Sequence, residues 1–147
     1  MTQATGLFLD LVRVETRLYN TADARLRADS ELTLGQFQLL DIVGRVPNCR
    51  VNDIVRELAI TVGATSKAVD RVESAGLLRR EANPGDRRSS ILTLTSDGAT
   101  RLEAARPVLE RILVALTADV VAPDDLARTA AVLSTLRVSL ERLERGS

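Results

Sequence analysis

Residues 58–98 decide the fold, and they read LAITVGATSKAVDRVESAGLLRREANPGDRRSSILTLTSDG. The first part of this stretch is typical of a short helix. Thr61 is suited to cap its N-terminus, because a threonine oxygen can accept a hydrogen bond from the first turn. Gly76 is suited to end it, because the residue after a helix often adopts a positive φ. The helical spacing defines one inward face, formed by Thr65, Ala68, Val69 and Val72.

The second part of the stretch is typical of a β-hairpin. Beyond Gly76 the helical period stops, and residues 77–82 and 89–94 are predicted to form two short strands. They are joined by the four residues Asn83-Pro84-Gly85-Asp86. Proline followed by glycine at the centre of such a turn favours type II, in which the glycine has a positive φ.

The sequence on either side is predicted to be helical. A long N-terminal helix is indicated by one apolar stripe, formed by Leu7, Leu11, Val14, Leu18, Ala22 and Leu26. Residues 33–36 fit a capping box that opens a second helix, and residues 51–58 fit a short third one. Two long helices are expected after Thr95. Pro107 should kink the first of them or break one hydrogen bond, and Pro123 should start the second.

This order of elements predicts a winged helix-turn-helix: helix, short helix, tight turn, capped helix, strand, turn, strand. The expected fold class is mostly α with a small β-hairpin wing (α+β), flanked by long N- and C-terminal helices. No internal repeat, low-complexity tract or linker divides the sequence. A single domain is therefore expected over residues 1–147.

The composition limits the class of protein. Of 147 residues, 45% are hydrophobic and only 2% aromatic, which favours an aliphatic helical core. The chain has no histidine and a single cysteine, Cys49, so an internal disulfide is excluded and no metal or cofactor is expected. No constellation of an acid, a base and a nucleophile points to an enzyme. No membrane span or N-terminal leader pattern is found, so a cytoplasmic protein is expected.

The placement of charge indicates a nucleic-acid partner more than the net charge does. The formal net charge is zero, but residues 50–90 carry eight basic and six acidic side chains. A helix over residues 61–75 would fit the major groove of double-stranded DNA, and a paired arginine at the hairpin tip suits the minor groove. The residues expected to contact DNA are Gly63, Ala64, Ser66, Lys67, Asp70, Arg71, Arg87 and Arg88.

These charges also have plainer interpretations. Lys67 and Arg71 can solvate an exposed helix face. Asp70 can accept a hydrogen bond from cytosine or can orient Arg71, and the structural role is favoured. A winged helix can also be a protein-interaction module, although such a module would not require paired arginines at the wing.

The same residues resemble the MarR family of bacterial transcription regulators. The resemblance is strongest in the segments Ser66–Glu73, Gly76–Arg80, Asp86–Ser89 and Leu94–Gly98. It implies a homodimer built from about residues 5–30 and 96–145, a winged helix-turn-helix lobe over about 33–95, and a pseudo-palindromic operator. It also implies that Asp86 braces a wing arginine by ion pairing. Repression is expected, because a dimer over a promoter blocks polymerase.

The resemblance further implies release from DNA by a small aromatic or phenolic ligand, bound between the dimerisation helices and the DNA lobe. Arg13 and Arg17, one helical turn apart, are candidate partners for a carboxylate, or else ion-pair partners of Asp10 and Glu15.

Some relatives sense peroxides through a cysteine, so a redox-sensing role for Cys49 is an alternative. Arg50 beside it could favour the thiolate. The reactive cysteine of those relatives lies near the start of the first helix, however, which makes an incidental thiol the favoured interpretation.

Overall fold

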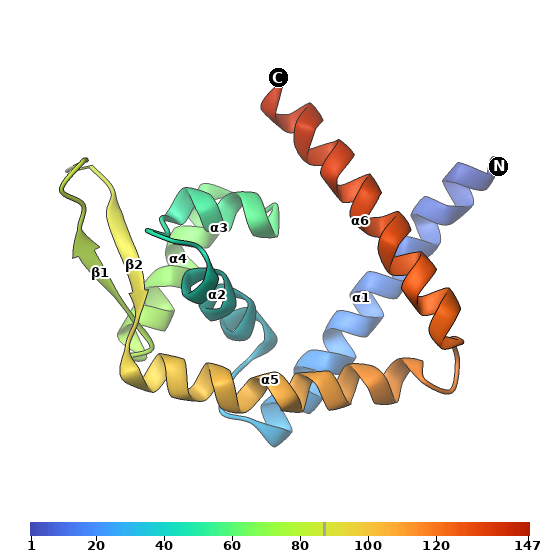
Figure 1. Cartoon of the computed structure of the whole chain (residues 1–147), viewed down its shortest axis with the longest axis horizontal. Helices are drawn as coiled ribbons and strands as arrows, with labels where there is room; N and C mark the ends of the chain where they lie inside the picture. The colour runs from blue at the N-terminus through green and yellow to red at the C-terminus, as the bar shows by residue number, and fades with distance from the viewer. Residues whose placement is uncertain (87) are drawn as a thin grey trace. The chain divides into compact units, whose positions relative to one another are not determined.

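The computed structural model describes residues 1–86 and 88–147 (Figure 1). Its elements are α1 (Gln3–Asp29), α2 (Leu34–Arg45), α3 (Val51–Leu58), α4 (Val62–Ser74), β1 (Leu78–Ala82), β2 (Ser90–Leu94), α5 (Ser96–Thr117) and α6 (Pro123–Arg145). The predicted fold class is confirmed, with a two-stranded antiparallel hairpin in a mostly helical chain.

The chain divides into two compact units, residues 1–110 and 111–147, and the boundary falls inside α5. Pro107 lies within α5 and does not end it. The proposed division into a winged-helix lobe and a dimerisation lobe remains a prediction.

The helix ends follow the capping chemistry that the sequence predicts. Thr33 and Gln36 form the capping box at α2, with Gln36 N donating to Thr33 Oγ1 over 3.1 Å and Thr33 N donating to Gln36 Oε1 over 2.9 Å. Thr61 caps α4 by accepting from Ala64 N over 3.1 Å. Gly76 has a φ of 77°, which confirms its place after α4.

The expected type II turn in the hairpin is wrong. Asp86 N donates to Asn83 O over 3.2 Å, as in any closed four-residue turn, but Gly85 does not have a positive φ. The side chain of Asn83 accepts from Gly85 N over 3.0 Å instead. This side-chain bond stabilises the turn without the glycine conformation that type II requires.

The core of the first unit is aliphatic, as the composition predicts. Its fully buried large side chains come from α1 to α5, the α1–α2 connection and the hairpin: Leu26, Leu32, Leu39, Leu40, Ile54, Val69, Leu77, Leu78, Leu92 and Leu102. In Figure 1, α2, α3 and α4 lie together with the hairpin beside α4. Burial of this kind fixes α4 and the hairpin on one support.

Backbone hydrogen bonds fix the base of the hairpin. The strands pair in register from Leu78 opposite Leu94 to Ala82 opposite Ser90. On the other side of β2, Leu92 N donates to Cys49 O over 2.7 Å. Thr95 then joins the hairpin to α5, since its hydroxyl donates to Gly76 O over 2.6 Å and accepts from Gly98 N over 3.0 Å.

Two helices expose apolar faces. In α1, Ala22 and Leu26 are buried, whereas the N-terminal half exposes large hydrophobic residues: Leu7, Phe8, Leu9, Val12 and Val14. No residue of α6 is buried, and its exposed hydrophobic residues are Leu126, Val132, Leu133, Leu136, Leu140 and Leu143. Among the described residues, no helix is both long and apolar enough to cross a membrane.

Candidate nucleic-acid interface

The short helix α4 presents a polar face on an apolar support. Thr65, Val69 and Val72 are buried on its inner side. Of the predicted contact residues on this helix, the exposed ones are Gly63, Ala64, Lys67, Asp70 and Arg71, and Ser66 is half-buried. A Cβ added at Gly63 would meet no atom within 4 Å, so the start of α4 is open to an approaching partner.

The hairpin loop is held by Asp86. Its carboxylate accepts from Arg88 N over 2.9 Å and from Ser89 Oγ over 3.2 Å. Asp86 therefore braces the loop through the backbone amide of Arg88 and through Ser89, not through the guanidinium of Arg88. The Arg88 side chain is exposed. Arg87, the other predicted wing contact, lies outside the described residues.

One hollow of about 380 Å³ joins α4 to the hairpin loop. From α4 it is lined by Val62 and Ser66, and from the loop by Asp86 and Arg88. Arg50 and Asn52, at the start of α3, complete the same wall. The N-terminal half of α4 and the tip region of the hairpin thus border a common surface.

Asp70 is bound by Arg80 of β1. Arg80 Nη2 donates to Asp70 Oδ1 over 2.7 Å, and Arg80 Nη1 donates to Glu73 Oε1 over 2.6 Å. The interpretation that Asp70 orients Arg71 is therefore replaced by a pairing with Arg80. Burial lowers the pKa of Arg80, but the hydrogen bond that Arg80 donates to Asp70 and the charge of Glu73 outweigh it, so the pKa is raised overall.

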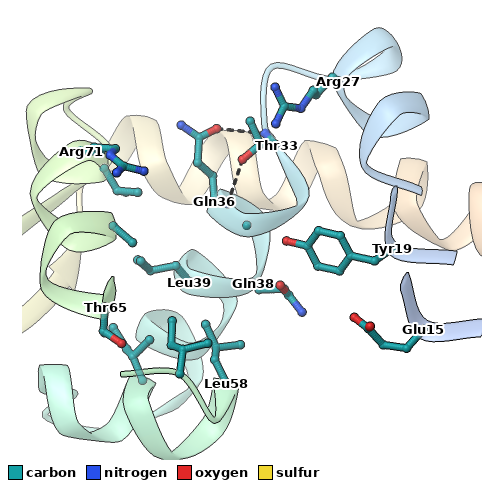
Figure 2. Close-up of a pocket in the computed structure, with 15 residues that line it drawn as sticks. Glu15, Tyr19, Arg27, Thr33, Gln36, Gln38, Leu39, Leu58, Thr65 and Arg71 are labelled. Atoms are coloured by element: carbon teal, nitrogen blue, oxygen red, sulfur yellow. Dashed lines mark hydrogen bonds between the residues drawn. The ribbon is translucent and has the colours of Figure 1, made fainter. Parts of the chain in front are cut away.

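A second cavity, of about 620 Å³, lies between α1, α2 and α4 within the first unit (Figure 2). Its polar wall includes Tyr19 and Arg27 from α1, Gln36 from α2 and Arg71 from α4. Figure 2 shows the Tyr19 ring reaching from α1 toward α2, with Arg71 on the α4 side. Burial, followed by the charge of Asp23, raises the pKa of the Tyr19 hydroxyl, so it is a hydrogen-bond donor at neutral pH.

The predicted ligand residues Arg13 and Arg17 do not line this cavity. Arg13 Nη1 lies 3.4 Å from Asp10 Oδ1, and Arg17 Nη1 donates to Arg13 O over 3.3 Å. The surface ion pair weighed for Arg13 is thus present. The cations that reach the cavity come instead from Arg27 and Arg71.

Comparison with known proteins identifies the fold and shows a family likeness in its central segment. Residues 30–89, which hold α2, α3, α4 and the hairpin loop, match the model of the MarR family. This segment is similar to the MarR family over those residues.

One relative is the HTH-type transcriptional regulator YwhA of Bacillus subtilis, 33% identical over 60 residues that cover 41% of this chain and 43% of the relative. The chain thus matches less than half the length of that relative. Among solved structures, it is similar to Sco3205 of Streptomyces coelicolor, a MarR family transcriptional regulator in complex with DNA (TM-score 0.79, 23% identity, 97% of this chain and 89% of the other).

The chain is also similar to BpsR of Bordetella bronchiseptica, a structure concerned with the regulation of DNA binding by 6-hydroxynicotinic acid. The TM-score is 0.71 and the identity 25%, over 86% of this chain and 98% of the other.

The thiol of Cys49 is buried. Cys49 is 1% exposed, and its Sγ lies 3.7 Å from Arg50 O. Burial, followed by the charge of Asp53, raises the pKa of the Cys49 thiol to about 11. A neutral, buried thiol is a poor nucleophile, so the burial and the raised pKa of Cys49 disfavour the redox-sensing alternative. Among the described residues, no three candidate ligands gather to hold a metal ion.

Sequence reasoning missed three residues of these sites. Val62 is 55% exposed at the first position of α4 and lines the hollow. The available signal in the sequence was its position, directly after the Thr61 cap of α4. Arg80 and Tyr19 gave no local signal, because their partners are brought near by the hairpin and by the packing of α1 on α2.

Proposed function

We propose that the protein is a sequence-specific DNA-binding transcription regulator that binds a pseudo-palindromic operator as a homodimer and represses transcription. The observation that carries this proposal is the common hollow bordered by α4 and the hairpin loop. A recognition helix and a wing that share one surface can contact the major groove and the adjacent minor groove of one duplex. The DNA complex of the similar protein Sco3205 supports the same use of the fold.

The proposed contacts are divided between helix and wing. Gly63 and Ala64 would let the start of α4 approach the duplex, Ser66 and Lys67 would face the base edges, and Arg71 would lie at the edge of the same face. Arg87 and Arg88 would contact the minor groove. Asp70 is withdrawn from this set, because Arg80 already occupies its carboxylate.

The homodimer is proposed from the apolar faces of α1 and α6. Each face carries several exposed leucine or valine residues, and exposed apolar area of this extent marks an interaction site. A second copy of the chain would cover it and present two copies of α4 to half-sites about one helical turn apart. Leu136→Glu, at an exposed position of α6, should yield a folded monomer in sedimentation, with Arg128→Glu on the same helix as the control.

The effector is proposed to be a small aromatic or phenolic acid in the 620 Å³ cavity. Arg27 and Arg71 would face its carboxylate and Tyr19 its ring or hydroxyl. The regulation of BpsR by 6-hydroxynicotinic acid supports a ligand of this class. Calorimetric titration with 6-hydroxynicotinic acid and with benzoic acid tests the proposal. Binding that Arg27→Met weakens and Arg13→Met does not is the expected result.

The test of the proposed function is a DNA-binding titration with genomic fragments at two salt concentrations. Saturable binding that weakens steeply with salt is expected, since phosphate contacts release counterions. Lys67→Ala should relax the preference by about 1–3 kcal/mol at one base pair of each half-site. Absence of binding even at low salt would favour the alternative, a winged-helix protein-interaction module.

A further inference from the structure

Arg80 of β1 bridges two carboxylates of α4. Its Nη2 lies 2.7 Å from Asp70 Oδ1 and its Nη1 lies 2.6 Å from Glu73 Oε1. Its backbone N–H also donates to Glu73 Oε2 over 3.1 Å. Asp70 and Glu73 are three residues apart and so lie on neighbouring turns of α4, where one planar guanidinium can reach both.

This arrangement changes the charge that α4 presents. The helix carries Lys67 and Arg71 but also Asp70 and Glu73, so the formal charges of its own side chains sum to zero. The Asp70 side chain is 64% exposed, on the helix proposed to approach DNA phosphates. Without a cation beside it, that carboxylate would repel the phosphates. The Arg80 side chain is only 28% exposed, so both of its bonded edges are turned toward the protein.

We propose that Arg80 is a positioning residue for DNA binding, which neutralises Asp70 and Glu73 and fixes α4 against the hairpin without contacting DNA itself. This inference rests on the proposed function. It predicts that replacing Arg80 weakens DNA binding only while the carboxylates of Asp70 and Glu73 remain.

Arg79 provides a matched control on the same strand. Its Nε lies 2.9 Å from Glu81 Oε1, and its side chain is 61% exposed. It forms an ion pair within β1. In the part of the chain that the structure describes, it forms no hydrogen bond or ion pair with Asp70 or Glu73. Arg79→Met removes the same charge from the hairpin while leaving the α4 carboxylates paired.

The experiment measures the affinity of four proteins for a fluorescein-labelled duplex that the parent binds. They are the parent, Arg79→Met, Arg80→Met, and the combined variant Arg80→Met, Asp70→Asn, Glu73→Gln. Arg80→Met should bind about tenfold more weakly, because each subunit then carries two unpaired carboxylates. The combined variant should return to within about threefold of the parent, and Arg79→Met should stay close to it.

Different outcomes would overturn the inference. If the combined variant stays as weak as Arg80→Met and its salt slope falls by about one unit per subunit, Arg80 is a direct phosphate contact. Binding of Arg80→Met at parental affinity would remove the positioning role. A restored combined variant also rules out misfolding as the cause of weak binding, since it lacks the same arginine.

The failure of the proposed function would be visible separately, because the parent would then bind no duplex before any residue is changed. The contact of Arg80 with Asp70 and Glu73 can also be tested without DNA. Urea unfolding of Asp70→Asn, Arg80→Met and the double variant should show non-additive losses of stability. Additive losses would contradict the coupling between the two side chains.

Discussion

The backbone of Gly98, in the first turn of α5, lies directly against the carbonyl oxygen of Leu77. A Cβ at Gly98 would overlap that oxygen and approach the Leu77 carbonyl carbon to 2.8 Å. Thr95 closes the same junction through Gly76 O. The contact ties the start of α5 to the connection between α4 and β1, so the hairpin and α5 are held together at one point.

Gly98→Ala should destabilise the protein by roughly 2–4 kcal/mol, because a backbone carbonyl cannot move aside as a flexible side chain can. Urea unfolding monitored by circular dichroism measures the loss. Gly6→Ala is the control, since a Cβ there meets no atom within 4 Å. Equal stability of the two variants would show that the contact is not tight.

Substitutions at Gly63 should change protein stability and DNA binding independently of each other. Because its Cβ position is open, Gly63→Ala should raise the free energy of unfolding by about 0.5–1 kcal/mol through helix propensity. Gly63→Tyr should also fold, but it should abolish DNA binding by blocking the approach of α4. Normal binding by the tyrosine variant would place the duplex away from the start of this helix.

Arg87 and Arg88 are expected to bind DNA by electrostatic attraction to phosphates or to the negative potential of the minor groove. Arg87→Ala together with Arg88→Ala should weaken binding to all sequences and flatten the salt slope by about one unit per lost phosphate contact. Anisotropy titrations at four salt concentrations measure the slope. Parental affinity in the double variant would count against the wing assignment.

Cys49 should be unreactive in the folded protein. Because burial raises the pKa of the Cys49 thiol from 9.0 to about 11, a thiol reagent at pH 8 should react about a hundredfold more slowly with the folded protein than with the protein in urea, where the ordinary pKa returns.

The free energy of unfolding should be unaffected by Cys49 below about pH 9 and should fall as the pH rises toward 11, because the thiol of the unfolded chain ionises first. Cys49→Ser should leave any response to oxidants unchanged, and a lost response would restore the redox-sensing alternative.

The parts of the fold that depend on local chemistry could be predicted from the sequence. The Thr33 and Thr61 caps, the positive φ of Gly76 and the two strands all follow from residues a few positions apart. The turn at Gly85 could not be predicted in detail, because the Asn83 side chain stabilises another conformation.

The site residues that depend on packing were harder to predict. Arg80 reaches Asp70 only because the hairpin folds back on α4. The cavity takes its cations from Arg27 and Arg71, whereas spacing on one helix pointed to Arg13 and Arg17. A pattern on a single helix shows which side chains share a face, but not which neighbouring element will meet that face.

The central claim is that two copies of α4 and the wing bind one duplex. Selection of sequences from a random DNA pool by the purified protein tests it most directly. The expected result is an enriched inverted repeat whose half-site centres lie about 10 base pairs, one helical turn, apart. A pool that remains random, or that enriches only a single half-site, would contradict it.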